Sequence, residues 1–416
     1  MKPRLPTLAF PSGLKLSPEE QLTVVQEMQA VLAETLHNER IFRNGQASLD
    51  KKRWKEVKAK DDFRIYKERN PKSTEATSFS DRDHSVVFSD IMAPRFVSVR
   101  DDPAMSTVSS TWTTDSSEVE AGIVHSIKHP RVPMIVAAGN VEGLLEDVVF
   151  GSLAGDEASW RYRATYMKDK IADSKILATI QEPTEDDPYR FLCIKWFARE
   201  CPPFLSPFIQ QRDFLVMEAT GLTVDEYGVR HGYYIMHEFH HPSLPELRHL
   251  KMQRCKISLG YISRQVRPDK VHIFARGFVD PRGDFPHSLS VQLTAEAMTS
   301  TANTVETSYM KKLGWLMVQK QNKRRNQQNP HLIPPTVCSC KKTKKASLLT
   351  CQVCANSFCS RCTVQRKLVV DMQSDNVVER SMPFCFGCVL KAKKQPPHPV
   401  AVDMVVRPRS QLHPST

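Results

Sequence analysis

Residues 288–320, SLSVQLTAEAMTSTANTVETSYMKKLGWLMVQK, form the stretch on which the predicted fold depends. The stretch contains no proline and one glycine, Gly314. Its apolar side chains recur at helical spacing, which predicts a helix. At about 1.5 Å per residue this helix would run roughly 50 Å. The middle of the stretch, residues 295–304, is rich in Ala, Ser and Thr. Such small side chains either allow close helix packing or leave volume beside the helix.

Segments before this helix are rich in Val, Ile, Tyr, Phe and Trp and predict an antiparallel sheet. Two short strands are expected within residues 54–66, around a turn at 60–62, and a polar loop over 69–84. A strand followed by a helical stretch is expected within 133–150. Further strands are predicted at 160–166, 190–197, 213–222, 232–239, 256–266 and 272–278. Short loops with turn residues join these segments, so we expect the strands to pair antiparallel.

A second helix is predicted near the start of the chain. Ser17 has the position of an N-cap, Pro18 that of the first helical residue, and Glu20 completes a capping box. Apolar side chains then recur at helical spacing as far as Leu36. We expect this helix to pack on the domain that follows. A helix that binds a partner is the alternative.

The region of residues 50–320 resembles a steroidogenic-acute-regulatory-related lipid-transfer (START-like) domain. The resemblance rests on Trp54-Lys55-Glu56-Val57, on Gln211-Arg212-Asp213-Phe214-Leu215-Val216 and on the long helix. It implies an α+β helix-grip fold, in which a curved antiparallel sheet is closed by a long C-terminal helix. It also implies one hydrophobic ligand, a lipid or a sterol, in a tunnel under that helix. The helix residues expected to line the tunnel are Ala297, Met298, Thr301 and Val305. A solid core without ligand is the alternative.

Motifs of enzymes give no support for catalysis. His237-Glu238-Phe239-His240-His241 matches H-E-x-x-H, a pattern that binds zinc when both histidines lie on one helix face. Here the preceding residues have strand character and Pro242 follows. On a strand the two histidines would be about 13 Å apart at ~3.3 Å per residue, too far for one metal ion. The chain also lacks G-x-G-x-x-G, G-x-x-x-x-G-K-[ST] and G-x-S-x-G motifs, so we expect a protein that is not an enzyme.

Eight of the 11 cysteines lie between Cys338 and Cys388, in four closely spaced pairs. Each pair can supply two thiolates and a tetrahedral zinc ion takes four ligands, so the pairs predict two structural zinc ions. The pairs are Cys338 with Cys340, Cys351 with Cys354, Cys359 with Cys362, and Cys385 with Cys388. The spacing alone leaves open which pairs combine.

The cysteine-rich segment resembles a FYVE finger, a module that recognises phosphatidylinositol 3-phosphate on endosomes. The resemblance implies that the first pair joins the third and the second joins the fourth. One zinc ion would then be held by Cys338, Cys340, Cys359 and Cys362, and the other by Cys351, Cys354, Cys385 and Cys388. The family's basic R-R/K-H-H-C-R stretch is absent around Cys351, where the chain reads Ser347-Leu348-Leu349-Thr350-Cys351-Gln352.

Positive charge is concentrated in the same quarter of the chain. Of the net charge of +12, residues 323–394 carry +11, which indicates an anionic partner. An anionic membrane surface is the expected partner, contacted by Lys341, Lys342, Lys344, Lys345, Leu348 and Leu349. We expect no nucleic-acid binding, because residues 338–388 contain no Tyr or Trp on which bases could stack. A RING- or PHD-type protein-interaction finger, such as a ubiquitin-ligase adaptor, is the alternative.

The predicted organisation follows from these segments. The parts are a flexible N-terminus (1–16), a helix (17–45), a START-like domain (50–322), a linker (323–335), a FYVE-like finger (336–394) and a Pro-rich disordered tail (395–416). Residues 1–11 contain three prolines and no apolar core of a signal peptide. We therefore expect a cytoplasmic protein that associates peripherally with membranes, and the FYVE resemblance implies endosomal ones.

Overall fold

The computed structural model describes residues 10, 13–69, 122–200, 209–283, 285–326, 338, 340, 348–373 and 376–407. Most of the predicted loop at 69–84 and most of the N-terminal segment 1–16 lie outside these residues. In the part of the chain that is described, no helix combines the length and apolar character needed to cross a membrane.

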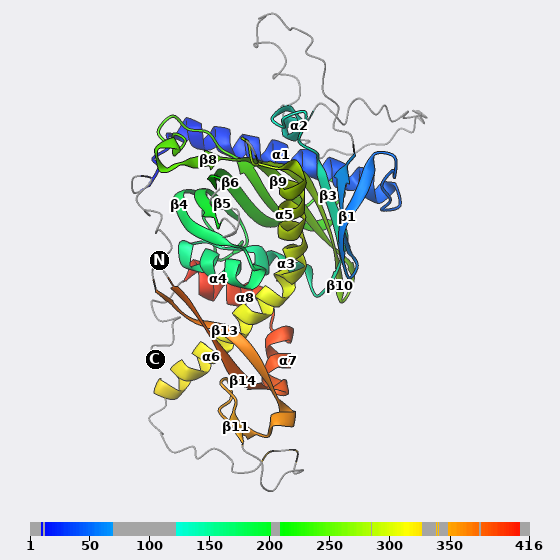
Figure 1. Ribbon diagram of the computed structural model, residues 1–416. Coiled ribbons are helices and arrows are strands. Elements are labelled where there is room, and N and C mark those ends of the chain that lie inside the picture. Colours follow the sequence, from blue (N-terminus) through cyan, green and yellow to red (C-terminus); the bar gives the residue numbers. More distant parts are fainter. Residues whose placement is uncertain are drawn as a thin grey trace, which may run out of the picture.

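A ten-stranded sheet forms the larger part of the molecule (Figure 1). Its strand order is β1-β2-β3-β10-β9-β7-β6-β5-β4, and all these neighbours pair antiparallel, while the short β8 pairs parallel with β6. The predicted antiparallel sheet is thus confirmed. The strands are β1 (Trp54–Lys60), β2 (Phe63–Glu68), β3 (Ile135–Glu142), β4 (Ile171–Gln181), β5 (Phe191–Arg199), β6 (Gln211–Val224), β7 (Arg230–Glu238), β8 (Met252–Arg254), β9 (Lys256–Arg267) and β10 (Lys270–Asp280).

Helices cover both faces of this sheet. Helix α1 (Pro18–Asn44) begins at Ser17, whose capping box with Glu20 is present as predicted, and buries Val24, Met28 and Val31 on one face. Helix α5 (His287–Ser300) buries Val291, Ala295 and Met298 against the other face. The α+β class, with an antiparallel sheet closed by C-terminal helices, is therefore confirmed. Further helical elements among the described residues are α2 (Ile123–Ser126), α3 (Leu145–Ser152), α4 (Glu157–Met167) and the 3₁₀ turn η2 (Arg248–Leu250).

The strand predicted at 160–166 is wrong, because these residues belong to α4. Asp156 caps the helix by accepting a hydrogen bond from the backbone N–H of Ser159. The buried side chains are Trp160, Arg163 and Ala164, a spacing that is helical rather than alternating. The aromatic content of the segment therefore suggested a strand, while its burial follows the helical period. Strand β4, which follows, was not predicted.

The long C-terminal helix is present but interrupted. Helix α5 ends at Ser300, one 3₁₀ turn η3 (Thr301–Asn303) follows, and α6 (Thr304–Asn326) continues. Hydroxyl groups around the interruption, those of Thr299, Ser300 and Thr304, donate to backbone carbonyl oxygens three or four residues earlier. Such side-chain bonds compete with regular helical bonding and bend helices. Helix α6 extends to Asn326, so residues 323–326, which were predicted to belong to the linker, are helical.

The described part of the cysteine-rich C-terminal region packs directly on α6. It contains β11 (Leu349–Thr350), β12 (Ser357–Phe358), η4 (Ser360–Cys362), the hairpin of β13 (Thr363–Gln373) and β14 (Asn376–Cys385), and α7 (Phe386–Lys394). Leu313 and Leu316 of α6 share an apolar cluster with Leu368, Phe384 and Cys388 of this region. Finger and sheet domain thus share one helix, as Figure 1 shows.

The tail predicted as disordered from residue 395 is wrong for residues 397–406. They form α8 (Pro397–Ala401) and a π-helical turn (Val402–Val406). Val400 and Ala401 are fully buried in a cluster with Phe150 of α3. Asp403 accepts hydrogen bonds from Trp315 and Gln319 of α6. High proline content suggested disorder, but these apolar residues have a surface on which to pack.

Candidate ligand cavity and metal centres

A cavity of about 470 Å³ lies between the concave side of the sheet and the α5–η3 segment. Apolar side chains of the strands form its floor, among them Phe197, Phe214, Met236, Ile257 and Leu259. Its volume falls within the range of about 300–1,000 Å³ that is typical of small-molecule sites. The sheet and its closing helices therefore enclose room for one hydrophobic molecule.

Of the four helix residues predicted to line this cavity, two line it and two do not. Ala297 and Thr301 do line the cavity, together with Leu293 and Thr294. Met298 is fully buried and Val305 is 4% exposed, and both pack in the apolar core. They do not border the cavity. The division follows the helical period, because residues three or four apart share one face.

A cluster of charged side chains lies beside the cavity floor. Glu218 of β6 accepts hydrogen bonds from Arg163 of α4 (3.0 and 3.3 Å) and from the hydroxyl of Tyr234 of β7 (2.6 Å). Lys195 of β5 donates a further bond to the same carboxylate. Arg163 and Tyr234 also line the cavity. The cluster thus links four elements below one wall of the cavity.

Two cations surround the single carboxylate of this cluster. Burial alone would raise the pKa of Glu218, but Arg163 and Lys195 lower it to about 2. Burial lowers the pKa of Lys195, an effect that Glu218 opposes. The ammonium group of Lys195 also lies 4.0 Å from the centre of the Trp160 ring, a favourable cation–π distance. The carboxylate is thereby held ionised inside an apolar domain.

This cluster was not predicted from the sequence, although a signal was present. Glu218 stands in Leu215-Val216-Met217-Glu218-Ala219 and Lys195 in Leu192-Cys193-Ile194-Lys195-Trp196. A charge in the middle of an apolar strand is expensive to bury unless it is paired. Each charge therefore indicated a partner, but pairing them requires knowing that β5 and β6 are neighbours.

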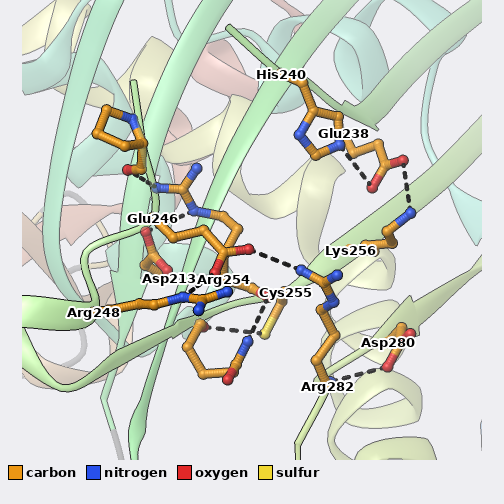
Figure 2. A network of polar contacts seen from close by, with 12 residues as sticks. Asp213, Glu238, His240, Glu246, Arg248, Arg254, Cys255, Lys256, Asp280 and Arg282 are labelled. Carbon is orange, nitrogen blue, oxygen red and sulfur yellow. Dashed lines mark hydrogen bonds and ion pairs between the residues drawn. The ribbon is translucent and has the colours of Figure 1, made fainter. Parts of the chain in front are cut away.

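A second polar network braces the sheet near the loop after β10. Buried Asp213 accepts hydrogen bonds from Trp196 (2.7 Å) and Arg254 (2.8 Å). In the same network Arg282 donates to Glu246 at 2.9 Å, and Figure 2 draws this pair. Asp213 belongs to the motif that carried the START resemblance, and β6 begins there as expected. Pro281 of the braced loop lines the cavity. The network therefore supports one end of the cavity wall.

The H-E-x-x-H segment is not helical. His237 and Glu238 lie on β7 and His241 follows the strand. Nδ1 of His237 is 2.8 Å from the hydroxyl of Ser258, and Glu238 lies between His240 and Lys256 (Figure 2). Among the described residues, the two motif histidines, His237 and His241, do not belong to a cluster that could hold a metal ion. The motif serves the packing of the sheet.

The cysteines gather into two groups of four, each of which could hold a metal ion. The first consists of Cys338, Cys340, Cys359 and Cys362, the second of Cys351, Cys354, Cys385 and Cys388. Within each group the sulfur atoms lie within 4.8 Å of one another. These are the same groups that the FYVE resemblance implied.

Sulfur distances fit tetrahedral coordination. Sγ of Cys340 is 3.7 Å from Sγ of Cys359, and Sγ of Cys354 is 3.9 Å from Sγ of Cys385. Zinc–sulfur bonds of about 2.3 Å place the corners of a tetrahedron about 3.8 Å apart. The donor sets are thus suitable for zinc.

The residues predicted to contact a membrane are only partly described. Lys341, Lys342, Lys344 and Lys345 lie outside the described residues. Leu348 and Leu349 are half-buried, and Leu349 pairs with Phe358 across the β11–β12 ladder. The membrane contact of these two leucines stays a prediction.

Comparison with known proteins identifies distant structural similarity alone. No family model and no curated protein matches the sequence. Human StAR-related lipid transfer protein 5 shares 15% identity over 69% of this chain and 97% of its own, with a TM-score of 0.40. Human STARD10 shares 12% sequence identity over 70% of this chain and 83% of its own, with a TM-score of 0.36. The human StarD13 (DLC2) lipid transfer and protein localization domain shares 10% sequence identity over 70% of this chain and 96% of its own, with a TM-score of 0.35. Similarities this low carry no conclusion about ligand or activity.

Proposed function

We propose that this protein binds one hydrophobic ligand, a lipid or a sterol, in the cavity under α5, as a non-catalytic carrier or sensor. The observation that carries the proposal is the cavity of about 470 Å³ with its apolar strand floor. Small-molecule sites are concave, mostly apolar spaces of about 300–1,000 Å³. The size and the apolar floor of this cavity therefore suit one small hydrophobic molecule.

The ligand should carry a polar group at one end. Arg163 and Tyr234 border the cavity and belong to the Glu218 cluster. Both side chains already donate hydrogen bonds to Glu218, and the oxygen of the Tyr234 hydroxyl can still accept one. A ligand hydroxyl that donates to this oxygen would fix the orientation of the ligand. Its apolar remainder would contact Phe214, Met236 and Leu259.

Filling the cavity tests the proposal. The double variant Ala297→Phe/Thr301→Phe should lose the bound lipid, because both side chains border the cavity. Native mass spectrometry of protein purified from cells without added lipid would detect the mass of the ligand. The matched control is Gln292→Phe, which adds the same ring on the exposed side of α5. Unchanged loading of the double variant, or no lipid in the parent protein even after incubation with mixed liposomes, would contradict the proposal.

We further propose that both cysteine groups hold structural zinc ions. Four thiolates leave no open position for water, so such sites are structural rather than catalytic. Mass spectrometry should find two zinc ions per chain. Replacing Cys354 by Ser should remove one ion and leave the other, since Cys354 belongs to one group alone. One ion, or none, in the parent protein would contradict the assignment.

Membrane attachment completes the proposed function. The basic C-terminal quarter would bring the cavity close to an anionic cytoplasmic membrane, with endosomes as the location that the FYVE resemblance suggests. Holding the cavity near a bilayer raises the local concentration of extractable lipid. This part of the proposal rests on charge distribution. Residues 323–394 carry +11 by their Lys, Arg, Asp and Glu, and eight thiolates with two zinc ions would reduce this to about +7.

A further inference from the structure

Helix α7 is held firmly on one side. It begins directly after Cys385, whose sulfur accepts a hydrogen bond from the backbone N–H of Cys388 at 3.4 Å. Cys388 and Ala392 are the buried residues of the helix, and both belong to the cluster shared with α6. The second cysteine group and α6 therefore fix which side of α7 faces outward.

The outward side presents two large apolar side chains. Phe386 is 52% exposed and Leu390 is 55% exposed. They are four residues apart, so they lie one above the other on the helix surface. Among the described residues of the finger, Val378 on β14 is the other large hydrophobic side chain exposed to this degree, at 37%.

The last turn of α7 carries three lysines. Lys391, Lys393 and Lys394 are exposed in its last turn, and α7 contains no acidic residue. Lys394 follows Leu390 by four residues, so it continues the row of Phe386 and Leu390. An apolar pair followed by a basic turn is the pattern of a surface that inserts into anionic bilayers.

We propose that the exposed side of α7, formed by Phe386, Leu390, Lys391 and Lys394, docks on an anionic membrane. Lys393 is left out of this surface, because its ammonium group lies over the ring of Tyr309 in α6, 5.1 Å from the ring centre. Positive charge complements the lipid headgroups, and the two apolar side chains reach the acyl region. The inference deepens the membrane-attachment part of the proposed function and is independent of the cavity ligand. It adds a second apolar contact to the predicted one at Leu348 and Leu349, and its two apolar side chains are more exposed than those half-buried leucines.

Vesicle sedimentation of the full-length, metal-loaded protein tests this surface. Phosphatidylcholine vesicles with and without phosphatidylserine are the probes. Phe386→Ser/Leu390→Ser should weaken binding to phosphatidylserine vesicles about tenfold or more, since two apolar side chains lose their insertion. Lys391→Gln/Lys394→Gln should weaken the same binding and flatten its salt dependence. Val378→Ser, on β14, should bind within twofold of the parent protein.

Three outcomes would overturn the inference. The first is a Phe386→Ser/Leu390→Ser variant that sediments with vesicles like the parent protein. The second is a parent protein that does not bind phosphatidylserine vesicles. The third is self-association through this surface. In that case the parent protein would be a dimer in the absence of vesicles, and the Phe386→Ser/Leu390→Ser variant would be a monomer. Metal content and cavity lipid, measured by native mass spectrometry, should be unchanged in the variants. Loss of lipid loading alone would count against the cavity and not against α7.

Discussion

Two consecutive lysines of α6, Lys311 and Lys312, are buried and meet different partners. Lys312 forms an ion pair with Asp147 of α3 at 2.7 Å and donates to the carbonyl oxygens of Lys393 and Gln395. Lys311 donates to the carbonyl oxygens of Phe150 and Leu153, at 2.6 and 2.8 Å. A neutral amine has two N–H donors, which these two carbonyls satisfy. Lys311 can therefore be buried without its charge.

This environment predicts a pH-dependent stability. Burial lowers the pKa of Lys311 to about 7, whereas an unfolded lysine titrates near 10.4. Between these values the unfolded chain binds more protons, so the free energy of unfolding should rise with pH above about 7, and this contribution should be absent below it. Lys311→Met should flatten that rise when urea unfolding is measured between pH 7 and 10.

The exposed Lys320 of the same helix supplies the comparison for this measurement. Lys320→Met should keep the pH dependence of the parent protein. Parallel pH profiles for the parent protein and Lys311→Met would show that Lys311 stays charged in the folded state.

At the level of elements, the crossing of α3 and α6 depends on one glycine. A Cβ added at Gly151 would lie 1.9 Å from the carbonyl oxygen of Thr304, a separation that no real Cβ tolerates. The same crossing carries the Asp147–Lys312 ion pair and the bond from Ser308 to Asp147. Helix α6 begins at Thr304, next to the cavity. The spacing of the two helices therefore controls the position of the α5–η3 segment.

Gly151→Ala should push these helices apart. We expect a loss of about 1–3 kcal/mol in the free energy of unfolding, the usual cost of overpacking, together with weaker lipid loading. Gly314→Ala is the matched helical control, because its Cβ would meet its nearest neighbours at an ordinary 3.8 Å. That variant should be up to about 1 kcal/mol more stable. Equal effects of both substitutions in urea unfolding would refute the role of the close crossing.

Across the whole molecule, α6 is common to the sheet domain and the finger. Its Leu313 and Leu316 pack against Cys385 and Cys388 of the second cysteine group. The hydroxyl of Tyr166 in α4 accepts a hydrogen bond from the backbone N–H of Val369 in the β13–β14 hairpin, at 3.0 Å. After the finger, the chain packs again on the sheet domain through α8, and Arg407 forms an ion pair with Glu185. A finger held in this way should unfold together with the sheet domain.

Metal removal tests this coupling. Since bound metal stabilises the folded finger, a chelator should lower the melting temperature of the whole chain in one transition followed by circular dichroism. Added zinc should restore it. Two separate transitions, with the sheet domain melting at an unchanged temperature, would show that the finger is an independent module.

Local patterns in the sequence were sufficient for several features. Capping of α1 depends on Ser17 and Glu20, most strand assignments on β-branched and aromatic residues between turn residues, and the cysteine pairs on spacing, all of which involve neighbours along the chain. Other features required the folded chain. The cluster of Arg163 and Glu218 joins residues 55 positions apart. Val400 is buried in an apolar cluster with residues of α3 and β5, which lie far from it along the chain. Contacts between distant segments depend on how the elements pack, and no local pattern records that packing.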